Sequence, residues 1–76
     1  MPLDKDRNRT LVTLRDTPHG MHSRDLASAL GLSLEVVERH LQYCADYDLV
    51  RWKKKEGAGL AVITDRGRDY LSRQGA

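Results

Sequence analysis

Hydrophobic residues recur every three or four positions along most of this chain, and at every second position in one stretch. The first spacing is typical of a helix with one buried face, and the second of a half-buried strand. The alternating stretch surrounds a turn that contains two glycines, so it predicts an antiparallel hairpin. We therefore expect helices near residues 5–15, 23–30, 34–47 and 65–73, and strands near 49–55 and 60–64.

Capping and turn residues fall at the ends of these expected helices. Ser23, or the residue before it, can cap the second helix, and Ser33 can cap the third. Gly31 stands where the second helix must end in a left-handed residue. Asp48 ends the third helix, since aspartate tolerates the left-handed region, and Thr64 can cap the last helix.

The third expected helix has two distinct faces. Val37, Leu41 and Cys44 are spaced i, i+4 and i+7 and form its inward stripe. Arg39 lies two residues from the first two of these, so it must point toward solvent. The same argument, applied to every element, gives the expected core: Leu11, Leu26, Leu30, Val37, Leu41, Leu49, Trp52, Ile63 and Leu71. Trp52 is expected there rather than on a base-stacking surface, because the core is poor in aromatic residues.

The length of 76 residues fits one domain, and we assign residues 1–76 to it. Hydrophobic residues make up 39% of the chain and charged residues 32%, which is a globular composition. No apolar run is long enough to span a membrane, and the first residues lack the apolar stretch of a signal peptide. The single cysteine, Cys44, cannot form an internal disulfide, so we expect a cytoplasmic protein without membrane contact.

Positive charge is concentrated toward the end of the chain. Residues 1–48 carry a net charge of −2, and residues 49–76 carry +4. Four cations cluster in the expected hairpin: Arg51, Lys53, Lys54 and Lys55. Such a cluster suits the phosphates of a nucleic acid, but lysines on a strand also discourage edge-to-edge pairing of sheets. The charge run alone leaves both interpretations open.

Two helices joined by a short glycine-bearing turn are typical of a helix-turn-helix. The stretch from residue 25 to residue 50 resembles the DNA-binding core of winged helix-turn-helix regulators of the ArsR and MarR type. The matching positions are Leu26-Ala27, Leu30-Gly31-Leu32-Ser33, Val37, Arg39-His40-Leu41 and Leu49-Val50, followed by the step from Ile63 to Leu71. The resemblance covers residues 11–71. It implies a mainly α fold with a small β-hairpin: a three-helix core, a two-stranded wing and a C-terminal helix.

The resemblance also implies that the third helix lies in the major groove of double-stranded DNA, while the wing grips the backbone. Arg39 would contact guanine or clamp a phosphate, and Gln42 would pair with adenine. Each has a plain alternative, since Arg39 can form an ion pair with Glu35 or Glu38 and glutamine is a good helix former. The expected DNA-contacting residues are Ser33, Glu35, Glu38, Arg39, Gln42, Arg51, Lys53, Lys54 and Lys55.

The third helix departs from this family in its charge. Base-reading positions in the family are usually Ser, Thr, Gln or Arg, whereas Glu35 and Glu38 have the wrong sign for phosphates. A glutamate can, however, accept a hydrogen bond from cytosine N4. Together with Leu34 and Val36 the two glutamates also suit a protein partner. We therefore predict a small transcriptional regulator that binds DNA, sequence-dependently or non-specifically. The alternative is a protein–protein interaction module without DNA binding, and a homodimer is a further option.

No pattern in the sequence indicates catalysis or a cofactor. His40 lies one turn before Cys44 on the inner side of the third helix, where a partly buried hydrogen-bonding residue or a contact to a backbone phosphate is a better fit than a metal ligand. His19 and His22 lack enough nearby ligands to complete a metal site. We therefore expect no enzyme, no metal and no cofactor.

Overall fold

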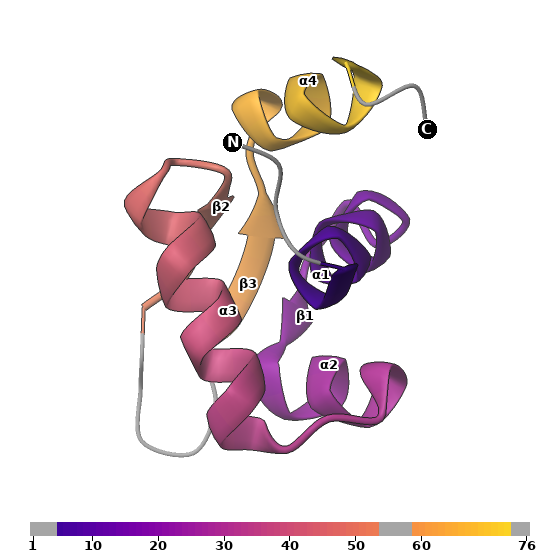
Figure 1. Ribbon diagram of the computed structural model, residues 1–76, viewed down its shortest axis with the longest axis vertical. Coiled ribbons are helices and arrows are strands. Elements are labelled where there is room, and N and C mark those ends of the chain that lie inside the picture. The colour runs from indigo at the N-terminus through magenta and orange to yellow at the C-terminus, as the bar shows by residue number, and fades with distance from the viewer. Residues whose placement is uncertain (1–4, 54–58, 74–76) are drawn as a thin grey trace.

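The computed structural model describes residues 5–53 and 59–73. All four expected helices and both expected strands are present, although the strands are shorter than expected (Figure 1). The elements are α1 (Lys5–Arg15), β1 (Met21–His22), α2 (Ser23–Leu30), α3 (Leu34–Asp46), β2 (Val50–Arg51), β3 (Leu60–Ile63) and α4 (Asp65–Arg73). The expected glycine turn and the end of the first wing strand lie outside the described residues.

Most helix ends are formed by the predicted residues. The Ser33 hydroxyl accepts a hydrogen bond from the Val36 N–H at 3.2 Å and so caps α3. Gly31 ends α2 with φ of 69°, and Asp48 follows α3 with φ of 60°, both in the left-handed region. Thr64 caps α4, since its hydroxyl accepts from the Gly67 N–H at 3.0 Å.

The start of α2 differs from the expectation. His22 occupies the capping position, but its side chain forms no capping hydrogen bond. Ser23 is fully buried as the first helical residue, and its hydroxyl has no partner among the described residues. Its N–H instead donates to the Gly59 carbonyl at 3.0 Å, so the start of α2 is tied to the wing by the backbone.

The sheet has three strands rather than the expected two. Its order is β1-β3-β2, with antiparallel pairing on both sides of β3. Met21 pairs with Ala61, and Val50 pairs with Ile63. Because β1 is only two residues long, it has no alternating pattern that could predict it.

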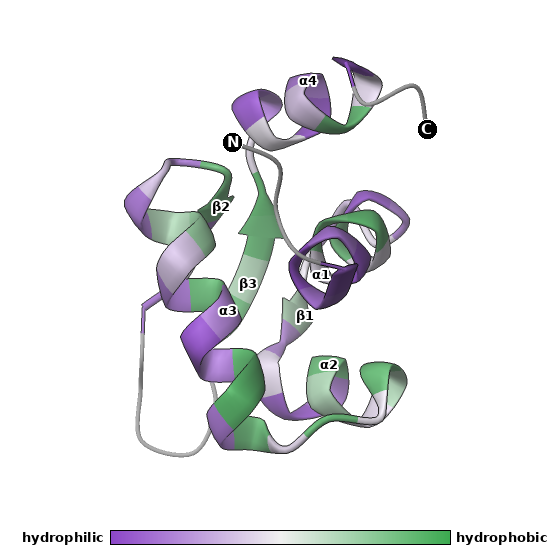
Figure 2. Cartoon of the chain, in the orientation of Figure 1, coloured by the Kyte–Doolittle hydropathy of each residue, from purple (hydrophilic) through white to green (hydrophobic). Residues whose placement is uncertain are grey.

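The core lies between the helices and the sheet. α1 packs against α2, α3, α4 and β3. α4 and α2 lie at opposite ends of the molecule (Figure 1). In Figure 2 β3 is mostly hydrophobic, whereas the helices are hydrophobic on part of their surface only. All nine residues that the sequence placed in the core are buried. None of the helices in the described ranges is long and apolar enough to cross a membrane.

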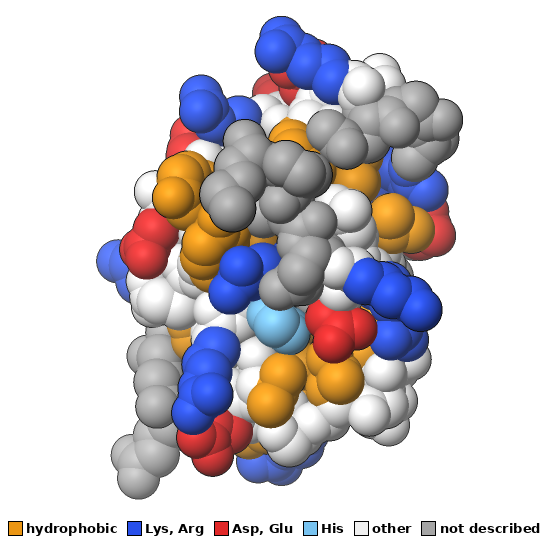
Figure 3. Space-filling view, in the orientation of Figure 1, with side chains coloured by type: hydrophobic (Ala, Val, Ile, Leu, Met, Phe, Trp, Pro, Cys, Tyr) orange, Lys and Arg blue, Asp and Glu red, His pale blue; other side chains and the backbone are white. Residues whose placement is uncertain are grey.

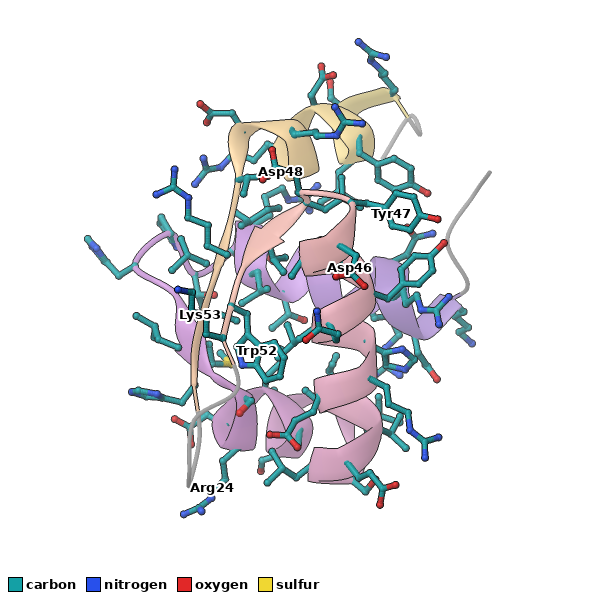
Figure 4. All side chains as sticks on the ribbon, turned by 90° about the vertical axis from the view of Figure 1, so that its left-hand side faces the viewer. Arg24, Asp46, Tyr47, Asp48, Trp52 and Lys53 are labelled. Carbon is teal, nitrogen blue, oxygen red and sulfur yellow. The ribbon has the colours of Figure 1, made fainter. Side chains whose placement is uncertain are left out.

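The wing is fixed to this core by Trp52. Its side chain is 7% exposed and points from the wing toward α3 (Figure 4). Gly59 lies against it, and a Cβ added there would collide with the Lys53 carbonyl oxygen. The close approach of the two wing segments therefore requires glycine at this position. The prediction that Trp52 belongs to the core is confirmed.

Candidate nucleic-acid interface

The exposed face of α3 is a single polar stripe opposite the core. Val37, Leu41 and Cys44 are fully buried on the inner face, as predicted. The outer face presents residues spaced i, i+4, i+7 and i+11, which a helix brings into one line. These are Glu35, Arg39, Gln42 and Asp46, and all four are exposed.

The four residues of this outer stripe form two pairs. Arg39 Nη2 lies 2.9 Å from Glu35 Oε1, and the two side chains are 73% and 78% exposed. Gln42 Nε2 donates to Asp46 Oδ1, also at 2.9 Å. Arg39 thus points to solvent as predicted, and it also forms the ion pair that was its plain alternative. α3 carries three carboxylates and one arginine, so its net charge is −2.

The other two expected contacts of α3 lie at its beginning and on its flank. Ser33 is exposed, and its hydroxyl is used for the cap. Glu38 is half-buried, so it lies at the edge of the outer stripe. Glu35 in the first turn is favourably placed for the helix dipole, which stabilises negative charge at this end.

The wing presents its cations differently from α3. Val50 and Trp52 are buried, whereas Arg51 and Lys53 are exposed, so the predicted alternation is confirmed over these four residues. Among the described residues neither Arg51 nor Lys53 has an ion-pair partner. The expected contacts Lys54 and Lys55 lie outside the described residues. On the face drawn in Figure 3, cationic and acidic side chains are interspersed rather than gathered into one basic surface.

The histidine and cysteine of α3 face inward. His40 is 9% exposed, and neither ring nitrogen has a hydrogen-bond partner within residues 5–53 and 59–73. Cys44 is buried and is not part of a disulfide. Over those same ranges no three or more His, Cys, Asp or Glu side chains are grouped so that they could hold a metal ion. The expected hydrogen-bonding role of His40 therefore has no partner in the described part of the chain.

A tyrosine cluster at the far end of α3 was not found from the sequence. Tyr43 and Tyr47 have ring centroids 4.8 Å apart, and the Arg7 guanidinium carbon lies 3.8 Å from the centre of the Tyr43 ring. Desolvation raises the pKa of Tyr43, and the neighbouring Tyr47 adds to the shift. A hollow of about 370 Å³ lies beside them, and Tyr70 also lines it. The i, i+4 spacing of Tyr43 and Tyr47 was the feature of the sequence that could have predicted this cluster.

Three helices, a three-stranded sheet and a helix that follows the wing define a winged-helix fold. This fold is that of MarR-family transcriptional regulators, so the resemblance inferred from the sequence is confirmed at the level of the fold. No family model and no curated protein matches the sequence.

Three solved structures illustrate the likeness. The MarR-family transcriptional regulator Sco5413 from Streptomyces coelicolor is 23% identical with a TM-score of 0.85, and the match covers 96% of this chain and 52% of that one. RV1404 from Mycobacterium tuberculosis is 27% identical with a TM-score of 0.80, over 95% and 50% of the two chains. A mutant of MepR from S. aureus, bound to an oligodeoxyribonucleotide, is 18% identical with a TM-score of 0.81, over 92% and 54%. The chain spans about half the length of these three proteins.

Proposed function

We propose that this chain is a winged-helix module that binds double-stranded DNA in transcriptional regulation, without catalysis. The observation that carries the proposal is the exposed outer stripe of α3, together with Arg51 and Lys53 of the wing, which are exposed and have no ion-pair partner among the described residues. A helix in this position fits the major groove, and the adjacent wing then reaches the backbone. The fold supports the same function, since it is shared with MarR-family regulators.

The wing and α3 would make different kinds of contact with DNA. Arg51 and Lys53, together with the two lysines that follow them, would contact phosphates and so provide affinity without sequence information. Arg39 and Gln42 would approach base edges, and Ser33, Glu35 and Glu38 would lie where α3 enters the groove.

A protein-binding module is the second candidate, and the charge of α3 favours it. Leu34 and Val36 are half-buried beside Glu35, so this end of α3 presents apolar and acidic groups together. Such a surface would bind a protein with apolar and basic groups. A protein-binding module of this kind would not bind DNA even at low salt.

An amide chemical-shift titration with a short DNA duplex at low salt separates the two candidates. DNA binding predicts shifts in α3 and in β2, and affinity that falls with salt because bound cations displace counterions. With two to four phosphate contacts, log K against log salt should have a slope of about −2 to −4. A titration that moves no amide in α3 or the wing would contradict DNA binding. Shifts caused by a protein partner and centred on Leu34 and Val36 would support the second candidate.

A further inference from the structure

The outer face of the sheet carries a row of two apolar side chains that the core does not use. Leu60 and Val62 alternate along β3 with the buried Ala61 and Ile63, so they point away from the core. Leu60 is 45% exposed. Gly20 lies against this row, since a Cβ added there would come within 2.8 Å of the Val62 side chain. The row is therefore left open on the side of β1.

The neighbouring strand places two cations beside this apolar row. Arg51 pairs with Val62, and the same antiparallel register brings Lys53 opposite Leu60. These four residues all line one hollow of about 480 Å³. Lys53 points away from α3 in Figure 4, whereas Trp52 points toward it. A cationic row and an apolar row thus lie side by side, about 5 Å apart.

Phosphate binding accounts for the cations of this face but not for its apolar row. A phosphate attracts Arg51 and Lys53 but gains nothing from the exposed Leu60. Carboxylates next to apolar side chains complement both rows at once. An acidic amphipathic helix has this combination on one face, and its residues i and i+4 are about 6 Å apart along the axis. Alternate residues of a strand have a similar spacing of about 7 Å.

We infer that the outer face of the sheet is a docking surface for an acidic amphipathic helix of a protein partner. Apolar side chains of the helix cover Leu60 and Val62, and its carboxylates pair with Arg51 and Lys53. This partner has the opposite charge to one that suits the acidic end of α3. The inference goes beyond the proposed function, and it does not require that the chain binds DNA.

The probe is a synthetic alanine-based peptide with leucines at i, i+3, i+4 and i+7, bordered by glutamates. One control peptide has serine in place of leucine, and a second has glutamine in place of glutamate. Amide chemical shifts of the protein give the affinity and the surface that the peptide contacts. Physiological salt is used because it screens attraction by charge alone.

Two variants of the docking surface are compared with two matched controls. Leu60→Ser is matched by Tyr47→Ser, which changes an exposed hydrophobic residue at the end of α3. Arg51→Gln is matched by Lys5→Gln, which removes an exposed cation at the start of α1. Thermal melting checks that all four variants are folded.

The probe should shift amides of β2 and β3 and should bind more tightly than either control peptide. Leu60→Ser should weaken its binding about fivefold through lost apolar burial, and Arg51→Gln about threefold through a lost ion pair. Both matched controls should bind as the wild type does. A serine peptide that binds as tightly as the probe, or shifts confined to other elements, would overturn the inference.

Titration of the wild type with a DNA duplex separates this inference from the proposed function. If the protein binds the duplex but not the peptide, the docking surface is wrong and DNA binding stands. If it binds the peptide but not the duplex, the docking surface stands and the proposed function is wrong.

Discussion

The outer stripe of α3 and the wing both present cations to solvent, but the cations differ in their surroundings. On α3 Arg39 is held by Glu35 at 2.9 Å. On the wing Arg51 and Lys53 are exposed, and neither has an ion-pair partner among the described residues. The two regions pack on the same core, but the cation of α3 is paired with a carboxylate and the two described cations of the wing are not.

This difference separates selectivity from affinity. An unpaired surface cation can exchange its counterions for a phosphate on any sequence, which makes its contribution general and salt-dependent. On α3 the carboxylate of Glu35 offsets the charge of Arg39, so the pair as a whole contributes less to this general attraction. The wing is therefore suited to anchor DNA, and α3 is suited to discriminate between sequences.

A substitution in the core that supports both α3 and the wing should have the largest effect, which is on the stability of the fold. Leu41 is fully buried on the inner face of α3, so Leu41→Ala should lower the free energy of unfolding by about 2–5 kcal/mol through lost burial and a cavity. Urea unfolding can be followed by the fluorescence of Trp52, the only tryptophan. In a domain this small, α3 and the wing should be lost together.

The matched control is Gln42→Ala, on the exposed side of the same helix. It should change the unfolding free energy by about 0.5 kcal/mol or less. Equal effects of the two substitutions would show that α3 is not anchored by its inner face.

The sequence predicts those parts of the molecule that depend on local patterns. The helices, the Ser33 cap and the left-handed Asp48 follow from periodicity and from the preferences of single residues. The buried position of Trp52 follows from alternation in the wing. These features are determined by residues that are close in the sequence, so they can be predicted from the sequence alone.

Features that depend on distant parts of the chain were missed or left open. β1 forms only because Met21 meets Ala61, and no local pattern marks a strand of two residues. The contact of Arg7 with Tyr43 joins α1 to α3 across the fold. For Arg39 the sequence predicts a solvent-facing position and, as an alternative role, an ion pair with Glu35 or Glu38, but only the structure shows that the pair with Glu35 is formed.

Loss of the α3 cation should affect preferred DNA sequences more than random ones. Arg39→Ala should weaken binding to a sequence selected by the wild type about 10- to 100-fold, because a bidentate contact to guanine is lost. Binding to random duplexes should weaken less, since no contact to a specific guanine is lost there. Anisotropy titrations with a selected and a random duplex give both values. An equal loss on the two duplexes would assign Arg39 to phosphate binding, as for the wing.

Removal of the cap at the start of α3 should have a smaller effect, and this effect is on stability rather than on sequence preference. Ser33→Ala removes the hydroxyl that accepts from the Val36 N–H, so it should lower the free energy of unfolding by about 1 kcal/mol. Ser28→Ala is the control, because Ser28 is an exposed residue within α2 that forms no cap. If both substitutions have the same effect in urea unfolding, the cap does not stabilise α3.

Neutralising one wing cation should have the smallest effect, and it should be the same for every sequence. Lys53 is exposed in the wing, so Lys53→Gln removes one phosphate contact without disturbing the core. The slope of log K against log salt should become shallower by about one unit, and affinities for selected and random duplexes should fall in equal proportion. Lys5→Gln is the control, since Lys5 is exposed at the start of α1, outside the proposed interface, and should leave the slope unchanged. A loss confined to the selected duplex would mean that the wing reads bases. In that case the contrast between an anchoring wing and a discriminating α3 would be wrong.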